Sequence, residues 1–176
     1  MSYRLDVLTD DVREAIRHVG GLMFDRRRAG WQVVVVTDDT AHSQALAILG
    51  ARIQPLDQAG VPSSAGPEIR TEVSPIGGRA AHGGGGRRRE PPAQRLLWGR
   101  QSDHGSTSDR HRVRHDLSPA ARTFKAQALY ATGLAASVDE CEHFWADGSL
   151  GAFGCWDLVP DEADLHLAGS GPRVGP

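Results

Sequence analysis

The start of the chain changes from strand-like alternation to a helical spacing of apolar residues. Apolar and polar side chains alternate over residues 3–8, which is typical of a short strand with one buried face. From Val12 to Met23 the apolar residues recur every three or four positions, which predicts a helix over about residues 11–28. Gly30 follows, and glycine commonly ends helices. The chain therefore opens with a strand and an amphipathic helix.

A second strand and helix follow this pair. The run Val33–Val36 has no polar member, which is typical of a strand in the middle of a parallel sheet. A short apolar helix over residues 45–49 and a third strand beginning at Arg52 continue the alternation. Strands that alternate with helices favour right-handed crossovers and parallel pairing. We therefore expect residues 1–57 to form an α/β core, a small Rossmann-like three-layer unit with a parallel sheet.

The periodicity stops near residue 57. Residues 60–112 contain ten Gly, five Pro, six Ser and nine Arg, and only seven of these 53 positions carry a large apolar side chain. Such a segment buries too little apolar surface to offset the entropy of ordering its backbone. We expect residues 58–117 to form a low-complexity linker, with Leu96–Trp98 as a short strand or an anchor. The alternative is an aberrant segment, because G+C-rich genes read out of frame yield these residue types.

Regular structure is expected to return after the middle segment. Ser118 followed by Pro119 is a strong helix-start signal, and Gly133 supplies the stop. We expect residues 118–156 to be a helical segment that packs on the core. Acids, Pro and Gly dominate the rest, so residues 157–176 are expected to form a disordered acidic tail.

Charge is distributed unevenly, although the formal net charge of the 176 residues is only −2. Arginines are concentrated in the middle of the chain and acids near its end, so the two blocks can attract one another or a partner. The chain has one lysine and no asparagine, a usage that indicates a high-GC organism. No signal-peptide pattern is present, and no run approaches the roughly 18 apolar residues of a membrane span. We expect a cytoplasmic protein without membrane contact. Its partner is unknown: a protein partner and self-association are the options, and nucleic acid is the less favoured one.

Two acidic pairs stand where strands lead into helices. Asp10 and Asp11 follow the first strand, and Asp38 and Asp39 follow the second. Ligands of open α/β sheets bind outside the carboxyl ends of the strands, and carboxylates there can hold Mg²⁺. Both pairs also precede helices, and helix capping alone accounts for the residue types. Capping is the favoured interpretation, and a ligand site at these four acids is the alternative.

The opening of the chain resembles the first half of a Rossmann-type domain, which implies a glycine-rich first turn if a dinucleotide binds. That turn, Thr9–Asp11, has no Gly-x-Gly-x-x-Gly, and its carboxylates would repel a pyrophosphate. A P-loop Gly-Lys-Ser/Thr is also missing from the sequence. NAD, FAD and P-loop nucleotide binding are therefore disfavoured, and any cofactor is unknown. The stretch Val33–Asp39 is similar to the first strand of receiver domains, which implies paired acids that bind Mg²⁺.

Cysteine and histidine offer few candidates. Two cysteines make neither a disulfide scaffold nor a four-cysteine metal site. Cys141, His143 and Cys155 could supply zinc ligands, but their spacing does not match an established zinc motif. His111 and His115 are interleaved with arginines, which would repel a metal ion, so no metal site is expected. Cys141 and His143 also have the residue types of a nucleophile and a base, although sequence neighbours need not be aligned in space.

Arginines of the middle segment are candidates for nucleic-acid contacts: Arg87, Arg88, Arg89, Arg110, Arg112 and Arg114. Aromatic residues for base stacking are nearly absent there, because Trp98 is alone. We therefore expect a non-catalytic α/β binding or interaction module of unknown function. One alternative is a Rossmann-like nucleotide- or metal-dependent transferase or hydrolase with its site at the four acids. A second alternative is nucleic-acid binding through these arginines, so the sequence leaves open whether the chain is an enzyme.

Overall fold

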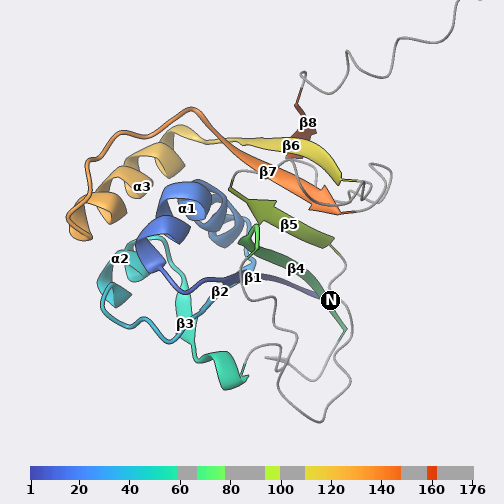
Figure 1. The fold of residues 1–176 in the computed structure, drawn as a ribbon, viewed down its shortest axis with the longest axis horizontal. Helices are drawn as coiled ribbons and strands as arrows, with labels where there is room; N and C mark the ends of the chain where they lie inside the picture. The colour runs from blue at the N-terminus through green and yellow to red at the C-terminus, as the bar shows by residue number, and fades with distance from the viewer. Residues whose placement is uncertain (59–66, 78–93, 100–109, 148–157, 162–176) are drawn as a thin grey trace, which may run out of the picture.

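The computed structural model describes residues 1–58, 67–77, 94–99, 110–147 and 158–161 (Figure 1). In chain order its helices and strands are β1 (Ser2–Leu8), α1 (Val12–Arg28), β2 (Gln32–Val36), α2 (Ser43–Ile48), β3 (Arg52–Gln54), β4 (Glu68–Pro75), β5 (Gln94–Trp98), β6 (Arg110–Asp116), α3 (Pro119–Ala131), β7 (Cys141–Asp147) and β8 (Leu158–Pro160). A short 3₁₀ helix (Leu56–Gln58) follows β3. Within these ranges, no helix has the length and apolar character needed to cross a membrane.

The elements from β1 to β3 form where the hydrophobic spacing predicts them. Asp11 is the N-cap of α1, because its carboxylate accepts hydrogen bonds from the backbone N–H groups of Arg13 and Glu14. Arg26–Arg28 occupy the last turn, beside the negative end of the helix dipole. Gly30 has a φ of 87°, a left-handed conformation that suits the turn into β2.

The strands form one eight-stranded sheet in the order β3-β2-β1-β4-β5-β7-β6-β8. The five strands from β3 to β5 in this order pair in parallel. Strand β7 lies between β5 and β6 and runs antiparallel to both, and β8 runs antiparallel to β6. The sheet is therefore mixed, and the expectation of a purely parallel, Rossmann-like sheet is wrong. The α/β class and the parallel β1–β2–β3 half are as expected.

Three strands lie within residues 58–117, where composition predicts a linker or an aberrant segment. Strand β4 pairs with β1 over six residue positions at the centre of the sheet, and β5 and β6 extend the sheet further. Average composition misleads here because alternate residues of β4 are charged. Arg70 and Glu72 lie on one face, and Val73 lies on the other face in the apolar core. The low-complexity run Gly83–Gly86 lies outside the described residues.

The C-terminal part contains the predicted helix and two strands that the sequence did not predict. The Ser118 side chain accepts a hydrogen bond from the backbone N–H of Ala121, and Pro119 begins α3. Strand β7 lies in the segment expected to be helical, and β8 lies in the segment expected to be a disordered tail. Only alternate residues of β7 face the core. This alternation covers too few residues to be told apart from a helical pattern in the sequence.

Helices α1, α2 and α3 all lie on the same face of the sheet (Figure 1), so the described part has two layers and not the expected three. The strand residues that face these helices form the apolar core, and they include Leu5, Val7, Val33, Val35, Val73, Leu96, Val113 and Phe144. From the helices, Ile16, Leu22 and Leu129 pack against them. Because side chains alternate across a strand, the residues between the core positions point to the opposite face.

Helices α1 and α3 approach closely at a pair of glycines. A Cβ atom would lie 2.4 Å from the Leu117 side chain if placed on Gly21, and 3.2 Å from Lys125 if placed on Gly20. Lys125 is buried at this contact, and its Nζ lies 2.7 Å from Oε1 of Glu142 on β7. Glu142 also accepts hydrogen bonds from two backbone N–H groups of α1. These three donors offset the cost of burying the carboxylate.

The sheet face opposite the helices carries a row of ion pairs across β1, β4 and β5, which we call the charged ladder. On β1, Arg4 Nε lies 2.6 Å from Asp6 Oδ1. Arg70 lies 3.7 Å from Asp6 and 3.8 Å from Glu72 on β4. Arg95 on β5 lies 3.2 Å from Glu72. The two acids and Arg4 are buried, and the alternating signs give each buried charge an opposite neighbour.

Candidate functional site

The carboxyl ends of β1 and β2 form the edge of the sheet at which the sequence predicts a ligand site. Beside β1 the strand order changes direction, because β2 lies on one side and β4 on the other. Ligands of open α/β sheets bind outside the carboxyl ends of the strands at such a point. The turns after β1 and β2 carry the four acids predicted as a ligand site, Asp10, Asp11, Asp38 and Asp39.

The backbone already uses three of these four carboxylates. Asp11 caps α1, as described above. Asp39 Oδ1 accepts a hydrogen bond from the backbone N–H of Ala41 at 3.0 Å, and its Oδ2 accepts one from the backbone N–H of Val12 at 3.4 Å. Asp38 Oδ1 accepts a hydrogen bond from the backbone N–H of Leu56 at 3.3 Å. These bonds tie the loop after β2 to the start of α1 and to the 3₁₀ helix.

The same contacts correct one part of the capping interpretation. Helix α2 begins after His42 without a side-chain cap, so Asp38 and Asp39 stabilise the loop and do not cap that helix. Asp10 is exposed. Among the described residues, no three or more His, Cys, Asp or Glu side chains are grouped so that they could hold a metal ion. The acidic turns are therefore explained by loop geometry, and a ligand site there stays a prediction.

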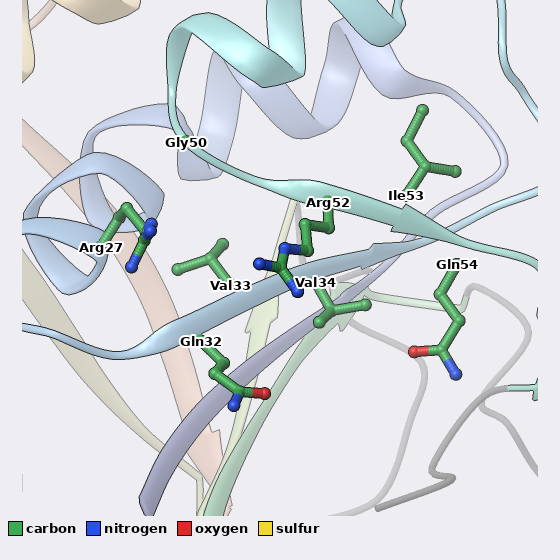
Figure 2. Close-up of a pocket in the computed structure, with 8 residues that line it drawn as sticks. All are labelled: Arg27, Gln32, Val33, Val34, Gly50, Arg52, Ile53 and Gln54. Carbon is green, nitrogen blue, oxygen red and sulfur yellow. The ribbon is translucent and has the colours of Figure 1, made fainter. Parts of the chain in front are cut away.

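A pocket of about 220 Å³ lies over β2 and β3, beside the C-terminal end of α1 (Figure 2). It is lined by Arg27, Gln32, Val33, Val34, Gly50, Arg52, Ile53 and Gln54. Arg27 comes from the last turn of α1, and Arg52 is the first residue of β3. In Figure 2 the Arg52 side chain extends from β3 back toward the end of α1, where Arg27 lies. Two separate elements therefore bring guanidinium groups to one pocket.

Gly50 sets the position of Arg27. A Cβ atom on Gly50 would lie 2.7 Å from Cγ of Arg27, so the missing side chain leaves room for the arginine stem. Gly50 also has a φ of 73°, in the left-handed region that glycine adopts without strain. Val33 and Ile53 supply apolar lining beside the charged groups. A few polar groups against apolar walls are the usual composition of a small-molecule site.

Two positive charges meet at this pocket. Arg27 and Arg52 are exposed, and within the described residues neither forms an ion pair. The negative end of the α1 dipole, about half an elementary charge, cannot balance two guanidinium groups. Gln54 connects the pocket to the charged ladder, because its Oε1 accepts a hydrogen bond from Arg4 at 2.9 Å. The pocket therefore favours an anion.

The arginines predicted for nucleic-acid contacts are placed differently. Arg112 lies 3.0 Å from Asp161, and Arg114 lies 3.2 Å from Asp116. Arg110 is half-buried on the same strand, β6. Arg87, Arg88 and Arg89 lie outside the described residues. Two of the three described arginines thus already have carboxylate partners, and nucleic-acid binding stays a prediction without a specific observation in its favour.

The structure places most of the histidines and cysteines considered as metal ligands, among them His115, Cys141 and His143. His115 on β6 is buried, and its Nε2 lies 3.1 Å from Oδ2 of Asp25 on α1. Cys141 and His143 do lie together, with Sγ and Nε2 3.4 Å apart. Cys155 is outside the described residues. Among the described members of this group, Cys141 and His143 make the contact that offers chemistry.

The pocket arginines are functional candidates that the sequence did not reveal. Arg27 belongs to a run of three arginines that the helix dipole already explains, and Arg52 reads as the first residue of a strand. No sequence motif links the two arginines. They meet only in the folded chain, where the turn at Gly50 brings β3 back beside the end of α1. No local signal could have paired them.

Comparisons with protein-family models, with curated proteins and with solved structures find no match for this chain. A function must therefore be inferred from the geometry of its own residues.

Proposed function

We propose that this chain is a non-catalytic α/β binding module, and that its ligand is a small anion bound between Arg27 and Arg52. The observation that carries the proposal is the convergence on one pocket of two guanidinium groups that have no ion-pair partner in the described part of the chain. A guanidinium presents its N–H donors in a planar fork that matches carboxylate and phosphate oxygens. A bound anion would remove the repulsion between the two cations.

The size of the pocket limits the ligand. Its volume of about 220 Å³ is below the roughly 300–1,000 Å³ that encloses a drug-sized molecule. A phosphate group or a small dicarboxylate fits this volume, and Val33 and Ile53 can contact a short apolar part of the ligand. Because both arginines are exposed, salt should screen the interaction.

Binding can be tested by calorimetry and thermal melting with inorganic phosphate and with succinate. The reference is sodium chloride at the same ionic strength. A ligand that binds only the native state at about 100 times its Kd adds about 2.7 kcal/mol of stability, so the melting temperature should rise by several degrees. Arg27→Gln and Arg52→Gln should each weaken binding about tenfold or more, because charge-assisted hydrogen bonds are lost.

Arg28→Gln is the matched control. Arg28 is exposed on the same helical turn as Arg27 but does not line the pocket. If this variant weakens binding as much as Arg27→Gln does, the anion responds to general positive charge and the pocket is not its site. No melting shift in the parent protein with either anion would refute the proposal.

A further inference from the structure

Strands β6, β7 and β8 bring together a cysteine, a histidine and an aspartate on the sheet face opposite the helices. Cys141 and His143 are two residues apart on β7, so their side chains point to the same face. Cys141 Sγ lies 3.4 Å from Nε2 of His143, and Nδ1 of His143 lies 3.1 Å from Oδ2 of Asp161. The three groups form a chain in the order thiol, imidazole, carboxylate.

Asp161 is held in place from two directions. Its backbone N–H donates to the carbonyl oxygen of Arg112 on β6 at 3.0 Å, which continues the β6–β8 pairing by one residue. Its Oδ2 also lies 3.0 Å from Nε of Arg112. The carboxylate that faces His143 is therefore fixed by the sheet itself.

This order of groups defines the proton positions. An ionised carboxylate only accepts hydrogen bonds, so Nδ1 of His143 carries the proton that faces Asp161. Nε2 then presents a lone pair to the thiol of Cys141. A nucleophile, a base and a third group that orients the base are the arrangement that activates a weak nucleophile.

The surroundings keep the resting sulfur protonated. Burial raises the pKa of the Cys141 thiol, the nearby carboxylate of Asp116 raises it further, and Arg114 opposes them. The carboxylates of Asp139 and Asp161 also raise the pKa of the thiol, by less. A preformed thiolate is thus disfavoured, and the thiol depends on a neighbouring base to react.

The site is open to small reagents. Cys141 is partly exposed, the side chain of His143 is 44 % exposed, and that of Asp161 is 15 % exposed. Acyl transfer would also need donors that stabilise an oxyanion. Thiol–disulfide exchange makes no such demand, because the negative charge leaves on sulfur. These three side chains are sufficient for that reaction.

We propose that Cys141 is a reactive thiol that exchanges with small disulfides, with His143 as its general base and Asp161 as the group that orients the base. Nε2 of His143 takes the thiol proton, and the thiolate attacks one sulfur of the disulfide. A new S–S bond forms to Cys141 as the old S–S bond breaks. The leaving thiolate takes the proton from His143, so one disulfide and one thiol are consumed and one of each is formed.

This inference is independent of the proposed anion pocket. Strands β2 and β3, which line the pocket, are at one end of the strand order, and β7, β6 and β8 are at the other. Anion binding and thiol exchange can therefore fail or succeed separately.

The test measures the rate at which Cys141 reacts with dithiodipyridine, a neutral disulfide that does not sense the charge of Arg114. A Cys155→Ser background leaves Cys141 as the single thiol of the chain. We expect the folded protein to react at least about tenfold faster at pH 7 than the same protein in denaturant. The rate should rise as the imidazole loses its proton, because only the neutral ring can act as a base.

Substitutions separate general-base catalysis from simple exposure. His143→Gln should slow the reaction about tenfold or more and remove that part of the pH dependence. Asp161→Ala should have a smaller effect in the same direction, because the imidazole keeps its position on β7 but loses its orienting acceptor. His111→Gln on β6 is the control and should react like the parent. The proposal is overturned if the folded protein reacts more slowly than the unfolded one, or if His143→Gln leaves the rate and its pH dependence unchanged.

Discussion

The two faces of the sheet differ along the same strands. On β1, Leu5 and Val7 enter the apolar core under the helices, whereas Arg4 and Asp6 belong to the charged ladder on the other face. Burial of the first pair contributes stability in proportion to apolar area. Burial of the second pair contributes little net stability, because the desolvation of each charge offsets its attraction to its partner.

This difference separates the part of the molecule that stabilises the fold from the part that offers chemistry. The helix-covered face is closed by α1, α2 and α3. The groups that can bind a ligand or react lie elsewhere. Arg52 lies beside the ladder at one end of the sheet, and Cys141 with His143 lies at the other. Substitutions in the apolar core should therefore change stability, whereas substitutions of Arg52, Cys141 or His143 should mainly change ligand chemistry.

The largest effect is expected from a charge placed in the helix-covered core. Val35→Asp puts a carboxylate at a position with 0 % exposure among apolar neighbours. An unpaired buried carboxylate costs several kcal/mol, comparable with a total stability of about 5–15 kcal/mol, so this variant should not fold. Circular dichroism and thermal melting measure the outcome.

The neighbouring position is the control for this experiment. Val34 points to the opposite face, where it pairs in register with Arg52 and with Asp6. Val34→Asp places its charge between Asp6 and Arg52 at the edge of the ladder. The Arg52 cation offsets part of the cost, so this variant should lose less stability than Val35→Asp. Equal loss of folding in both variants would mean that the two faces tolerate charge equally badly.

The next largest effect is expected at the buried pair between α3 and β7. Lys125→Met removes the cation that lies 2.7 Å from Glu142 and leaves a buried carboxylate without its counter-ion. Breaking such a pair costs about 3–5 kcal/mol, measured by urea unfolding. The double variant with Glu142→Gln should recover part of the loss. Arg17→Met, which breaks the exposed pair with Glu14, should cost less than about 0.5 kcal/mol.

The same contrast between faces explains what could be predicted from the sequence. The run from β1 to β3 was predictable because it contains a two-sided apolar strand, Val33–Val36, and a long amphipathic helix. Strand β4 was not predictable, because the charged ladder residues Arg70 and Glu72 alternate with its apolar residues. Strand β7 was missed for a related reason, since buried Glu142 interrupts its core-facing residues.

The candidate sites were predictable only in part. The spacing of Cys141 and His143 is visible in the sequence, but it places both side chains on one face only once the segment is known to be a strand. Asp161 joins them through the β6–β8 pairing, which has no local signal. Arg27 and Arg52 meet through the turn at Gly50, and that contact is likewise a property of the folded chain.

A smaller effect, with opposite signs, is expected for one acid on helix α1 and one acid on the ladder. Burial alone would raise the pKa of Asp25, but hydrogen bonds from His115 and Ser118 lower it below its ordinary value of 3.8. Its stabilising contribution is present above that value and is lost as the pH falls through the folded-state pKa. Asp25→Asn should cost about 1–3 kcal/mol at pH 7 and much less in acid.

Asp6 on the ladder should behave in the opposite way. Burial raises its pKa above 3.8, although Arg4 and Arg70 oppose the shift. Its favourable contribution is complete below 3.8 and is lost as the pH rises through the folded-state pKa. Asp6→Asn should therefore remove a decline of stability with rising pH, whereas Asp25→Asn removes a decline with falling pH. Urea unfolding between pH 3 and 7 compares the two slopes, and slopes of the same sign would contradict the contrast between the faces.

The smallest effect is expected at the carboxyl edge of the sheet, which belongs to neither face. Asp39→Asn keeps one side-chain oxygen, so it can keep the 3.0 Å bond to the loop backbone and loses only the weaker bond at 3.4 Å. Asp38→Asn likewise keeps an acceptor for Leu56. Each change should cost less than about 1 kcal/mol, and magnesium should not shift the melting temperature of either variant or of the parent.

If the acidic turns instead surrounded a cation, their carboxylates would repel one another in the metal-free protein. The Asn variants would then be more stable than the parent without magnesium and would lose a magnesium-dependent rise that the parent shows. Thermal melting with and without magnesium distinguishes the two outcomes, and the hydrogen bonds of Asp38 and Asp39 favour the first.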